Sequence, residues 1–314
     1  MNRGYDIICT GMALVDSIIK GFDPEPISAS GFRAASGSLN VGGEAVNEAM
    51  AAAKLGMHTG ILCSVGQDEA GNMIVGALSR IEVDTSLIVR SSDQTTPVTT
   101  MFVNDDGTRK SITNGAHRYN FHPERYISSF TGSGAVILGS LFRAPFDDPD
   151  IILSVLKGAK EAGCVTVADT KLPNFRFLTL TDIAESLPFI DYIAPNEDEA
   201  KYYSGKTEPD EMADVFLAGG VRNVIIKLGS KGCYFKNRTG SVVLPACRIN
   251  AVDATGAGDN FIAGFTCELL RGSTPEEAIR FANACGAICT TAVGAATALR
   301  NREQVLAFLD TQNI

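Results

Sequence analysis

Residues 253–261, which read Asp-Ala-Thr-Gly-Ala-Gly-Asp-Asn-Phe, form a glycine-rich turn that runs directly into a helix-like segment. Gly256 and Gly258 let a ligand approach the backbone, and the positive end of the helix dipole adds to the field of its N–H groups. We therefore expect a phosphate to bind here. Asp259 would repel that phosphate unless its carboxylate faced another group, such as a hydroxyl that must lose a proton. The pairing suggests phosphoryl transfer to an alcohol, with Asp259 as general base.

An ordinary helix start is the alternative interpretation of this stretch, because first-turn acids such as Asp259 often only complement the helix dipole. A dinucleotide-binding fingerprint fits less well, since its third glycine would fall at Phe261 and the stretch lies near the C-terminus. A Walker A motif is absent around Lys206, because Ala200 stands where its first glycine is required. The stretch alone does not decide between a helix start and a catalytic site.

The composition predicts one cytoplasmic α/β domain that spans residues 1–314. Hydrophobic residues make up 45% of the chain, and no Pro/Gly/Ser linker divides it. The formal net charge of −9 argues against a nucleic-acid or anionic-membrane surface. The eight cysteines lack C-x-x-C spacing and the chain has three histidines, so we expect reduced, buried thiols and no zinc site. Phe281–Leu299 is uncharged but interrupted by polar residues and glycines, which predicts a core helix ending near Gly294 rather than a membrane helix.

Apolar runs alternate with amphipathic segments along most of the chain. The runs that we expect to form buried strands are 6–12, 60–65, 135–138, 165–169, 192–195 and 224–228. The segments that we expect to form helices are 45–55, 70–81, 149–162, 181–187, 197–204, 260–270, 275–291 and 302–310. This alternation predicts a doubly wound, mostly parallel central sheet with flanking helices, whose ligands bind at the carboxyl ends of the strands.

Two stretches, Leu14–Asn40 and Ser86–Thr113, break the alternation and have the pattern of antiparallel strands with polar flanks. We expect them to form one small sheet apart from the main one. Such a sheet is either edge decoration or a lid that excludes water from the reacting phosphate, and the sequence leaves both open. Residues 98–103 carry apolar groups on both faces of the expected strand, which predicts a homodimer joined lid to lid.

Five motifs occur in order along the chain. They are Gly11-Met12-Ala13-Leu14-Val15-Asp16, Gly42-Gly43-Glu44-Ala45-Val46-Asn47, Pro195-Asn196-Glu197-Asp198-Glu199, Lys227-Leu228-Gly229-Ser230-Lys231-Gly232 and the D-x-x-G-A-G-D signature at 253–259. In this order they resemble the motifs of the ribokinase-like, PfkB-type carbohydrate kinases, and the resemblance runs from end to end. It implies the ribokinase-like fold with a small β-sheet lid. It also implies an ATP-dependent kinase that phosphorylates a hydroxyl, expected to be a primary one, of a monosaccharide or sugar acid.

The resemblance implies a role for each matching residue. Asp259 would take the proton of the acceptor hydroxyl, while the amides of Gly256, Ala257 and Gly258 would stabilise the phosphoryl oxygens. Sugar hydroxyls would be bound by Asp16, Gly42, Gly43 and Asn47. Asn196 and Glu199 would order Mg²⁺ and its waters, although without the resemblance they fit a solvated helix start. The nucleotide would contact Asn196, Lys227, Gly229, Gly232, Gly256 and Gly258, with Asn283 near the adenine.

The same resemblance bears on a cation site and on two candidate cations. The family often binds a monovalent cation such as K⁺, whose ligands here would be Asp253, the Thr255 carbonyl and carbonyls around Cys289, Ala292 and Gly294. Ala298 stands where some relatives supply a serine oxygen to this cation.

The stretch 169–173 reads Asp-Thr-Lys-Leu-Pro, where fructokinase-like relatives often read D-x-N-x-R. Lys171, and Arg109 on the expected lid, are therefore candidate substrate-binding cations, with surface solvation as the alternative.

Three function classes fit these residues: an ATP-dependent sugar kinase, a catalytically silent sugar or nucleotide sensor, and a dinucleotide-dependent oxidoreductase. The intact group from Gly256 to Asp259 disfavours the sensor, and Phe261 disfavours the oxidoreductase. A nucleoside kinase is the alternative within the family. The sequence leaves open whether the acceptor carries a carboxylate, a phosphate or no charge.

Overall fold

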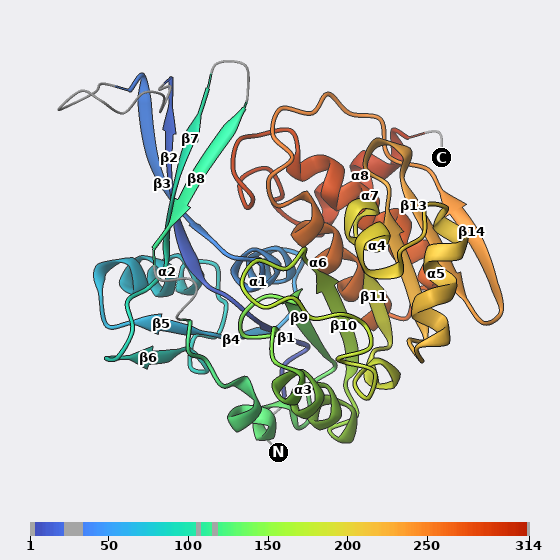
Figure 1. Cartoon of the computed structure of the whole chain (residues 1–314). Coiled ribbons are helices and arrows are strands. Elements are labelled where there is room, and N and C mark those ends of the chain that lie inside the picture. Colours follow the sequence, from blue (N-terminus) through green and yellow to red (C-terminus); the bar gives the residue numbers. More distant parts are fainter. Residues whose placement is uncertain (1–3, 22–33, 105–107, 115–118, 313–314) are drawn as a thin grey trace.

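The main sheet forms the centre of the protein and is mostly parallel (Figure 1). The computed structural model describes residues 4–21, 34–104, 108–114 and 119–312. Eight strands lie in the order β14-β13-β12-β11-β10-β9-β1-β4. Their bounds are β1 Ile7–Thr10, β4 Thr59–Leu62, β9 Ala135–Leu141, β10 Val165–Thr170, β11 Tyr192–Ala194, β12 Asn223–Lys227, β13 Cys233–Asn237 and β14 Gly240–Leu244. The strands from β4 to β12 pair in parallel, whereas β13 and β14 add an antiparallel edge.

Helices cover both faces of this sheet, because alternate residues of a strand point to opposite sides. Ile7 and Cys9 of β1 belong to one buried cluster, together with residues of α1, α6 and α7. Ile8 belongs to the other cluster, together with residues of α3, α4 and α5. The helices are α1 Glu44–Lys54, α2 Glu69–Ser79, α3 Pro149–Glu161, α4 Glu197–Ser204, α5 Pro209–Ala218, α6 Ala257–Leu270, α7 Pro275–Cys289 and α8 Arg302–Asp310. The doubly wound fold predicted from the alternation is confirmed.

A second, four-stranded sheet projects from the body beside α1 and α2 (Figure 1). In the order β3-β2-β7-β8, it contains β3 Ser36–Gly42, β2 Leu14–Lys20, β7 Val98–Val103 and β8 Arg109–Thr113. The two predicted stretches therefore form one small sheet, although 22–33 and 105–107 lie outside the described residues. The antiparallel prediction is wrong for β2 and β7, which pair in parallel. A crossover through α1 and α2 brings the second stretch back in the same direction. β5 Ser64–Gly66 and β6 Val89–Ser91 form a separate parallel pair.

The register of the small sheet separates a polar face from an apolar one. Asp16 shares a row across the strands with Asn40, Thr99 and Thr113. The next row points to the opposite side of the sheet, and it contains Ser17, Leu39, Thr100 and Ile112. Leu39 and Ile112 are 62% and 66% exposed. The sheet therefore presents Asp16 on its polar face and exposes apolar side chains on the other.

Residues 181–187 do not form the predicted helix. They form turns, followed by the 3₁₀ helix η3 Leu187–Phe189. Asp182 accepts hydrogen bonds from the N–H and the hydroxyl of Thr179, and this local arrangement competes with helix formation. Pro188 follows and cannot supply an N–H for a continuing helix. The sequence pattern also missed α5, β13 and β14.

The cysteines and the part of the uncharged segment that lies in α7 belong to the core. All eight cysteines are free and buried, as predicted. The segment from Phe281 belongs to α7, which ends at Cys289, earlier than the predicted end near Gly294. In the described ranges, no helix is long and apolar enough to cross a membrane.

Gly264 sets the close approach of α6 to α7, since a Cβ there would lie 2.7 Å from the Cys285 sulfur. We expect Gly264→Ala to lower the free energy of unfolding by about 1–3 kcal/mol, because overpacking outweighs the better helix propensity of alanine. The matched control is Gly76→Ala in α2, where the added Cβ would meet nothing within 4 Å. This control should raise stability by about 0.5–1 kcal/mol. Urea unfolding measures both, and equal effects would contradict tight packing at Gly264.

Candidate active site

The carboxyl ends of neighbouring parallel strands bring several predicted residues to one edge of the main sheet. β10 ends in Asp169 and Thr170 and leads into Lys171, and β12 ends at Lys227. An isolated bridge pairs Lys227 with Asn196, which follows β11. The N-terminus of α6 lies at the same edge, since Lys227 Nζ is 3.4 Å from the position that a Cβ would take on Gly258.

Gly256 begins α6 in a left-handed conformation with φ of 78°. A Cβ on Gly256 would lie 2.2 Å from the Cβ of Ala295, so both the backbone and the space require glycine. N–H groups in the first turn of a helix lack partners within that helix. The N–H of Ala257 donates to the Ala254 carbonyl over 3.2 Å, which favours the amides of Gly256 and Gly258 as donors to a ligand. With the Lys227 ammonium beside them, they form a site suited to an anion.

Asp259 is the third residue of α6, and its side chain is buried. Asn47 Nδ2 donates a hydrogen bond of 2.7 Å to Asp259 Oδ2. Burial raises the pKa of Asp259 to about 6; the Lys171 ammonium opposes this rise, while Glu44 and Asp169 add to it. A carboxylate with such a pKa is ionised at neutral pH and remains basic enough to accept a proton from a hydroxyl.

Asp16 and the twin glycines lie against one another where the small sheet meets α1. A Cβ on Gly42 would lie 2.3 Å from Asp16 Oδ2, and a Cβ on Gly43 would lie 2.4 Å from the Met12 carbonyl oxygen. Gly43 also caps α1 with φ of 94°. Gly43 therefore requires glycine, whereas a side chain at position 42 would have to displace the Asp16 carboxylate. Burial raises the pKa of Asp16 to about 6, and the nearby Glu44 adds to this rise.

Lys171 is enclosed by acids rather than solvated at the surface. Its Nζ lies 3.5 Å from Asp169 Oδ2 and 3.7 Å from Glu44 Oε1. Asp169 is fully buried and also accepts a hydrogen bond from the Lys227 ammonium. Burial favours the protonated form of Asp169, but the charges of Lys227 and Lys171 outweigh it and lower the pKa. The two lysines and Asp169 therefore form one ionised group between the two sides of the site.

Three acids of this region were missed as site residues by the sequence analysis: Glu44, Glu48 and Asp169. The available signal was the spacing of Glu44 and Glu48, which are four residues apart and so lie on one side of α1 next to Asn47. Asp169 lies at the carboxyl end of an apolar strand, where a ligand-facing residue is expected. Arg109, the second candidate cation, lies in β8, but its side chain is outside the described residues.

Asn196 and Glu199 form a capping box at the start of α4. Asn196 Oδ1 accepts from the Glu199 N–H, and Glu199 Oε2 accepts from the Asn196 N–H, each over 2.9 Å. Their spacing therefore serves the helix start. An amide and a carboxylate near an anion site also fit the outer ligands of Mg²⁺, which keeps most of its waters. Among the residues that the structure describes, no group of three or more His, Cys, Asp or Glu side chains could hold a metal directly.

Gly229 and Gly232 lie in the turn between β12 and β13, with φ of 59° and 98°. A Cβ on Gly232 would lie 2.0 Å from the Leu244 carbonyl oxygen. Close packing against the Leu244 carbonyl therefore explains why glycine stands at position 232. Contact of Gly232 with the nucleotide stays a prediction.

Asn283 of α7 uses its side-chain amide within the protein. It donates to the Pro245 carbonyl over 3.0 Å and accepts from the Cys233 thiol over 3.1 Å. These bonds join α7 to the antiparallel edge of the main sheet. The adenine contact of Asn283 stays a prediction.

Internal hydrogen bonds bring together the predicted ligands of a monovalent cation. Asp253 Oδ1 accepts from the N–H and hydroxyl of Thr255, and Asp253 Oδ2 accepts from the Gly294 N–H. The Cys289 sulfur lies 3.4 Å from the Thr255 carbonyl oxygen and 3.3 Å from that of Ala295. These contacts hold Asp253, Thr255 and Gly294 together, and their binding of K⁺ stays a prediction.

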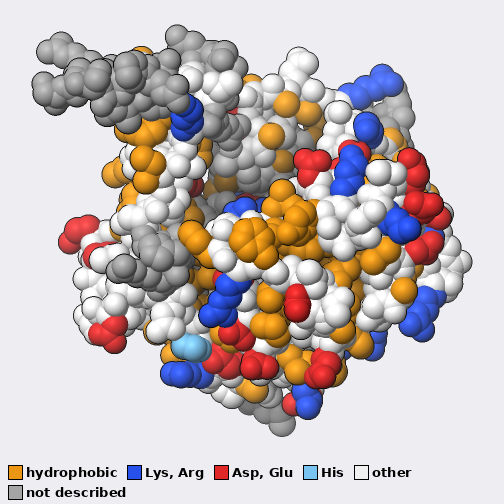
Figure 2. Space-filling model, viewed as in Figure 1, with side chains coloured by type: hydrophobic (Ala, Val, Ile, Leu, Met, Phe, Trp, Pro, Cys, Tyr) orange, Lys and Arg blue, Asp and Glu red, His pale blue; other side chains and the backbone are white. Residues whose placement is uncertain are grey.

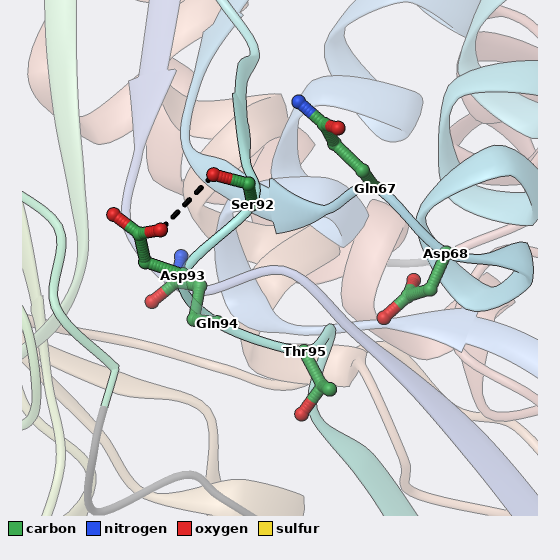
Figure 3. Close-up of a pocket in the computed structure, with 6 residues that line it drawn as sticks. All are labelled: Gln67, Asp68, Ser92, Asp93, Gln94 and Thr95. Atoms are coloured by element: carbon green, nitrogen blue, oxygen red, sulfur yellow. Dashed lines mark hydrogen bonds between the residues drawn. The ribbon is translucent and has the colours of Figure 1, made fainter.

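The small sheet and the body border a hollow (Figure 2). A separate open pocket is lined by Gln67, Asp68, Ser92, Asp93, Gln94 and Thr95 (Figure 3). Asp68 caps α2 through the Gly71 N–H and also accepts from the N–H and hydroxyl of Thr96. This pocket contains none of the predicted site residues, and its main acid already has protein partners, so it is not the candidate site.

Glu48 is a fully buried acid of α1 next to Asn47. Its exposed fraction is 0%, and neither carboxyl oxygen has a hydrogen-bond partner in the described part of the chain. A Cβ on Gly139 of β9 would lie 2.8 Å from Glu48 Oε2, so this glycine makes room for the acid. Burial raises the pKa of Glu48 well above its usual value, and the charges of Asp259 and Asp169 add to the rise. The environment therefore favours the uncharged form.

Comparisons with known proteins identify the family and support the fold. A family model described as pfkB family carbohydrate kinase matches residues 7–302. The chain is 30% identical over 275 residues to a ribokinase of Staphylococcus aureus, covering 84% of this chain and 86% of that one. It is 28% identical over 295 residues to a 2-dehydro-3-deoxygluconokinase of Bacillus subtilis, covering 88% of each. The structure of Arabidopsis thaliana ribokinase complexed with ribose and ATP matches with a TM-score of 0.83 and 24% identity, over 98% of this chain and 100% of that one.

Glu48→Gln tests the cost of burying this acid. In the unfolded chain Glu48 ionises above its ordinary pKa of 4.5, whereas burial retains its proton in the folded protein. This group should therefore lower wild-type stability as the pH rises above that value, by at most about 1.4 kcal/mol per pH unit. The stability of the glutamine variant relative to wild type should increase between about pH 5 and about pH 7.5. Urea unfolding measures the trend, and Glu161→Gln, at an exposed position of α3, should show none.

Proposed function

Because the chain belongs to the pfkB family of carbohydrate kinases, we propose that it transfers the γ-phosphoryl group of ATP to a primary hydroxyl of a small sugar. The observation that carries the proposal is the hydrogen bond from Asn47 to Asp259. It joins a residue of the expected sugar site to the expected base, at the start of a helix suited to binding phosphate. A nucleoside kinase stays the alternative within the family. A silent sensor would not need a buried acid at this helix start.

Each reacting group has a supporting residue in this scheme. The γ-phosphate would lie at the start of α6, where the amides of Gly256 and Gly258 and the Lys227 ammonium favour negative charge. Asp259 would take the proton as the acceptor oxygen forms its bond to phosphorus and the bond to the leaving ADP oxygen breaks. Asn196 and Glu199 would hold the waters of Mg²⁺, whose charge would neutralise the phosphates when it is bound.

Asp259→Asn tests the base. The amide keeps the shape of the side chain but cannot accept the proton, so kcat should fall by about 10²- to 10⁴-fold while the KM for ATP changes little. In the wild type, kcat/KM should fall as the pH drops below about 6, because Asp259 becomes protonated. ADP release with a confirmed sugar substrate measures both. Asp310→Asn, at an exposed position of α8, is the control, and an unchanged kcat in Asp259→Asn would remove the base role.

We also propose that two chains form a homodimer through their small sheets. An isolated small sheet with an uncovered apolar face is marginally stable in water. Leu39 and Ile112 lie in one row on the face opposite Asp16 and are largely exposed. A second copy would cover this face while leaving the polar face open to the substrate.

The double variant Leu39→Asp, Ile112→Asp should convert the dimer into a monomer, because buried charges oppose an apolar contact. The control is Val243→Asp on β14, where the valine is 61% exposed but lies in the main sheet. Light scattering at micromolar concentration measures the mass of each protein. A monomeric wild type with full kinase activity would contradict the dimer and leave the small sheet as a lid.

A further inference from the structure

Carboxylates surround the acceptor side of the site. Asp16 comes from β2, Glu44 from the first turn of α1 and Asp259 from the first turn of α6. Burial raises the pKa of Asp16 and of Asp259, and Glu44 adds to the rise at both. Glu44 Oε1 also lies 3.7 Å from Lys171 Nζ, which joins it to the charged group of Asp169. A sugar between these acids would meet three carboxyl groups from three separate elements.

The cations next to these acids are already paired. Lys171 Nζ lies within ion-pair distance of Glu44 and Asp169, and Asp169 also holds Lys227. An anionic substituent at Lys171 would share this ammonium with two carboxylates, while Asp16 and Asp259 still repelled it. The charge of Lys171 is already compensated by these acids, which weakens its attraction for a further anion.

The row of Asp16 and the next row on the polar face of the small sheet contain no cation. The row of Asp16 contains Asn40, Thr99 and Thr113, and the next row on this face contains Ile18, Ser38, Met101 and Ser111. Lys110 shares a row with Phe102 on the opposite face. Lys20 and Arg109 share the third row of this face, four residues along the strands from Asp16 and Thr113, a rise of about 13 Å between backbone positions at the usual spacing of a strand. The first two rows therefore offer no positive charge to an acceptor beside Asp16.

We propose that the acceptor is an uncharged sugar, and that Glu44 is a specificity residue that rejects sugars carrying a carboxylate or a phosphate. This inference rests on the proposed kinase function and narrows its substrate class. Carboxylates accept hydrogen bonds from neutral hydroxyls, so the acids that repel an anion can bind a polyol. Like charges placed together exclude a wrong partner more strongly than a missing contact does.

The test compares sugars that differ in charge. ADP release would be measured for D-ribose against D-ribonate, and for D-fructose against D-fructose 6-phosphate and 3-deoxy-2-ketogluconate. In whichever comparison contains a sugar that the wild type phosphorylates, we expect kcat/KM to be at least about 10-fold higher for the neutral sugar than for its anionic counterpart. Glu44→Gln keeps the size of the side chain, removes its charge and releases one partner of Lys171, so it should reduce this ratio by about 10-fold. Glu161→Gln on α3 is the matched control and should keep the wild-type ratio.

The outcomes separate this inference from the proposed function. A wild-type preference for the anionic sugars would overturn the inference while supporting the kinase, and an unchanged ratio in Glu44→Gln would remove Glu44 as the specificity residue. Absence of ADP release with every sugar and nucleoside would contradict the kinase function. Calorimetric binding of the same sugars to the wild type needs no turnover and no variant. Tighter binding of the neutral sugar would then support the inference, and equal or tighter binding of its anionic counterpart would overturn it.

Discussion

The buried hydrogen bond between Asn47 and Asp259 fixes α1 against α6, and the arrangement of the reacting groups depends on it. Both helices begin at a glycine with positive φ, Gly43 and Gly256. At each glycine a side chain would collide with a neighbouring group, so the chain approaches closely at both helix starts. The positive ends of the two helix dipoles therefore lie near the acids of the site and offset part of the cost of their charges.

Charge balance is the second constraint on this site. Asp169 is buried and ionised because Lys171 and Lys227 compensate it, whereas Glu48 has no such partner among the described residues and favours its uncharged form. The difference in surroundings, rather than in residue type, decides which acid carries charge. Burial of several acids lowers stability, which is a common property of sites that need a perturbed pKa.

The small sheet connects the acceptor site with the proposed assembly. Neighbouring residues of β2 point to opposite sides, so the strand that would present Asp16 to the proposed substrate also carries Ser17 in the row of Leu39 and Ile112. A partner on the apolar face would hold the strands that position Asp16. Substrate binding and assembly would then depend on the same strands, although they use opposite faces.

The sequence by itself determined the fold class and the helix start at the centre of the site. A glycine-rich turn with an acid three residues after Gly256 is a local pattern, and the alternation of strands and helices is a pattern of neighbours. The prediction from this alternation failed at 181–187, where hydrogen bonds between Thr179 and the Asp182 side chain compete with helix formation. The sequence also predicted a small sheet, but it did not predict that β2 and β7 pair in parallel.

Only the tertiary structure decided which charges meet. Asn47 and Asp259 are 212 residues apart in the sequence. Lys171, which follows β10, lies 3.7 Å from Glu44 at the start of α1. Folding brings these residues together through the order of the strands, which no local period encodes. Whether Lys171 is a free cation, and whether Glu48 is charged, depends on burial and on these distant partners. The sequence therefore predicted the residue types of the candidate site, and the packing of α1, α6 and β10 determined their electrostatic properties.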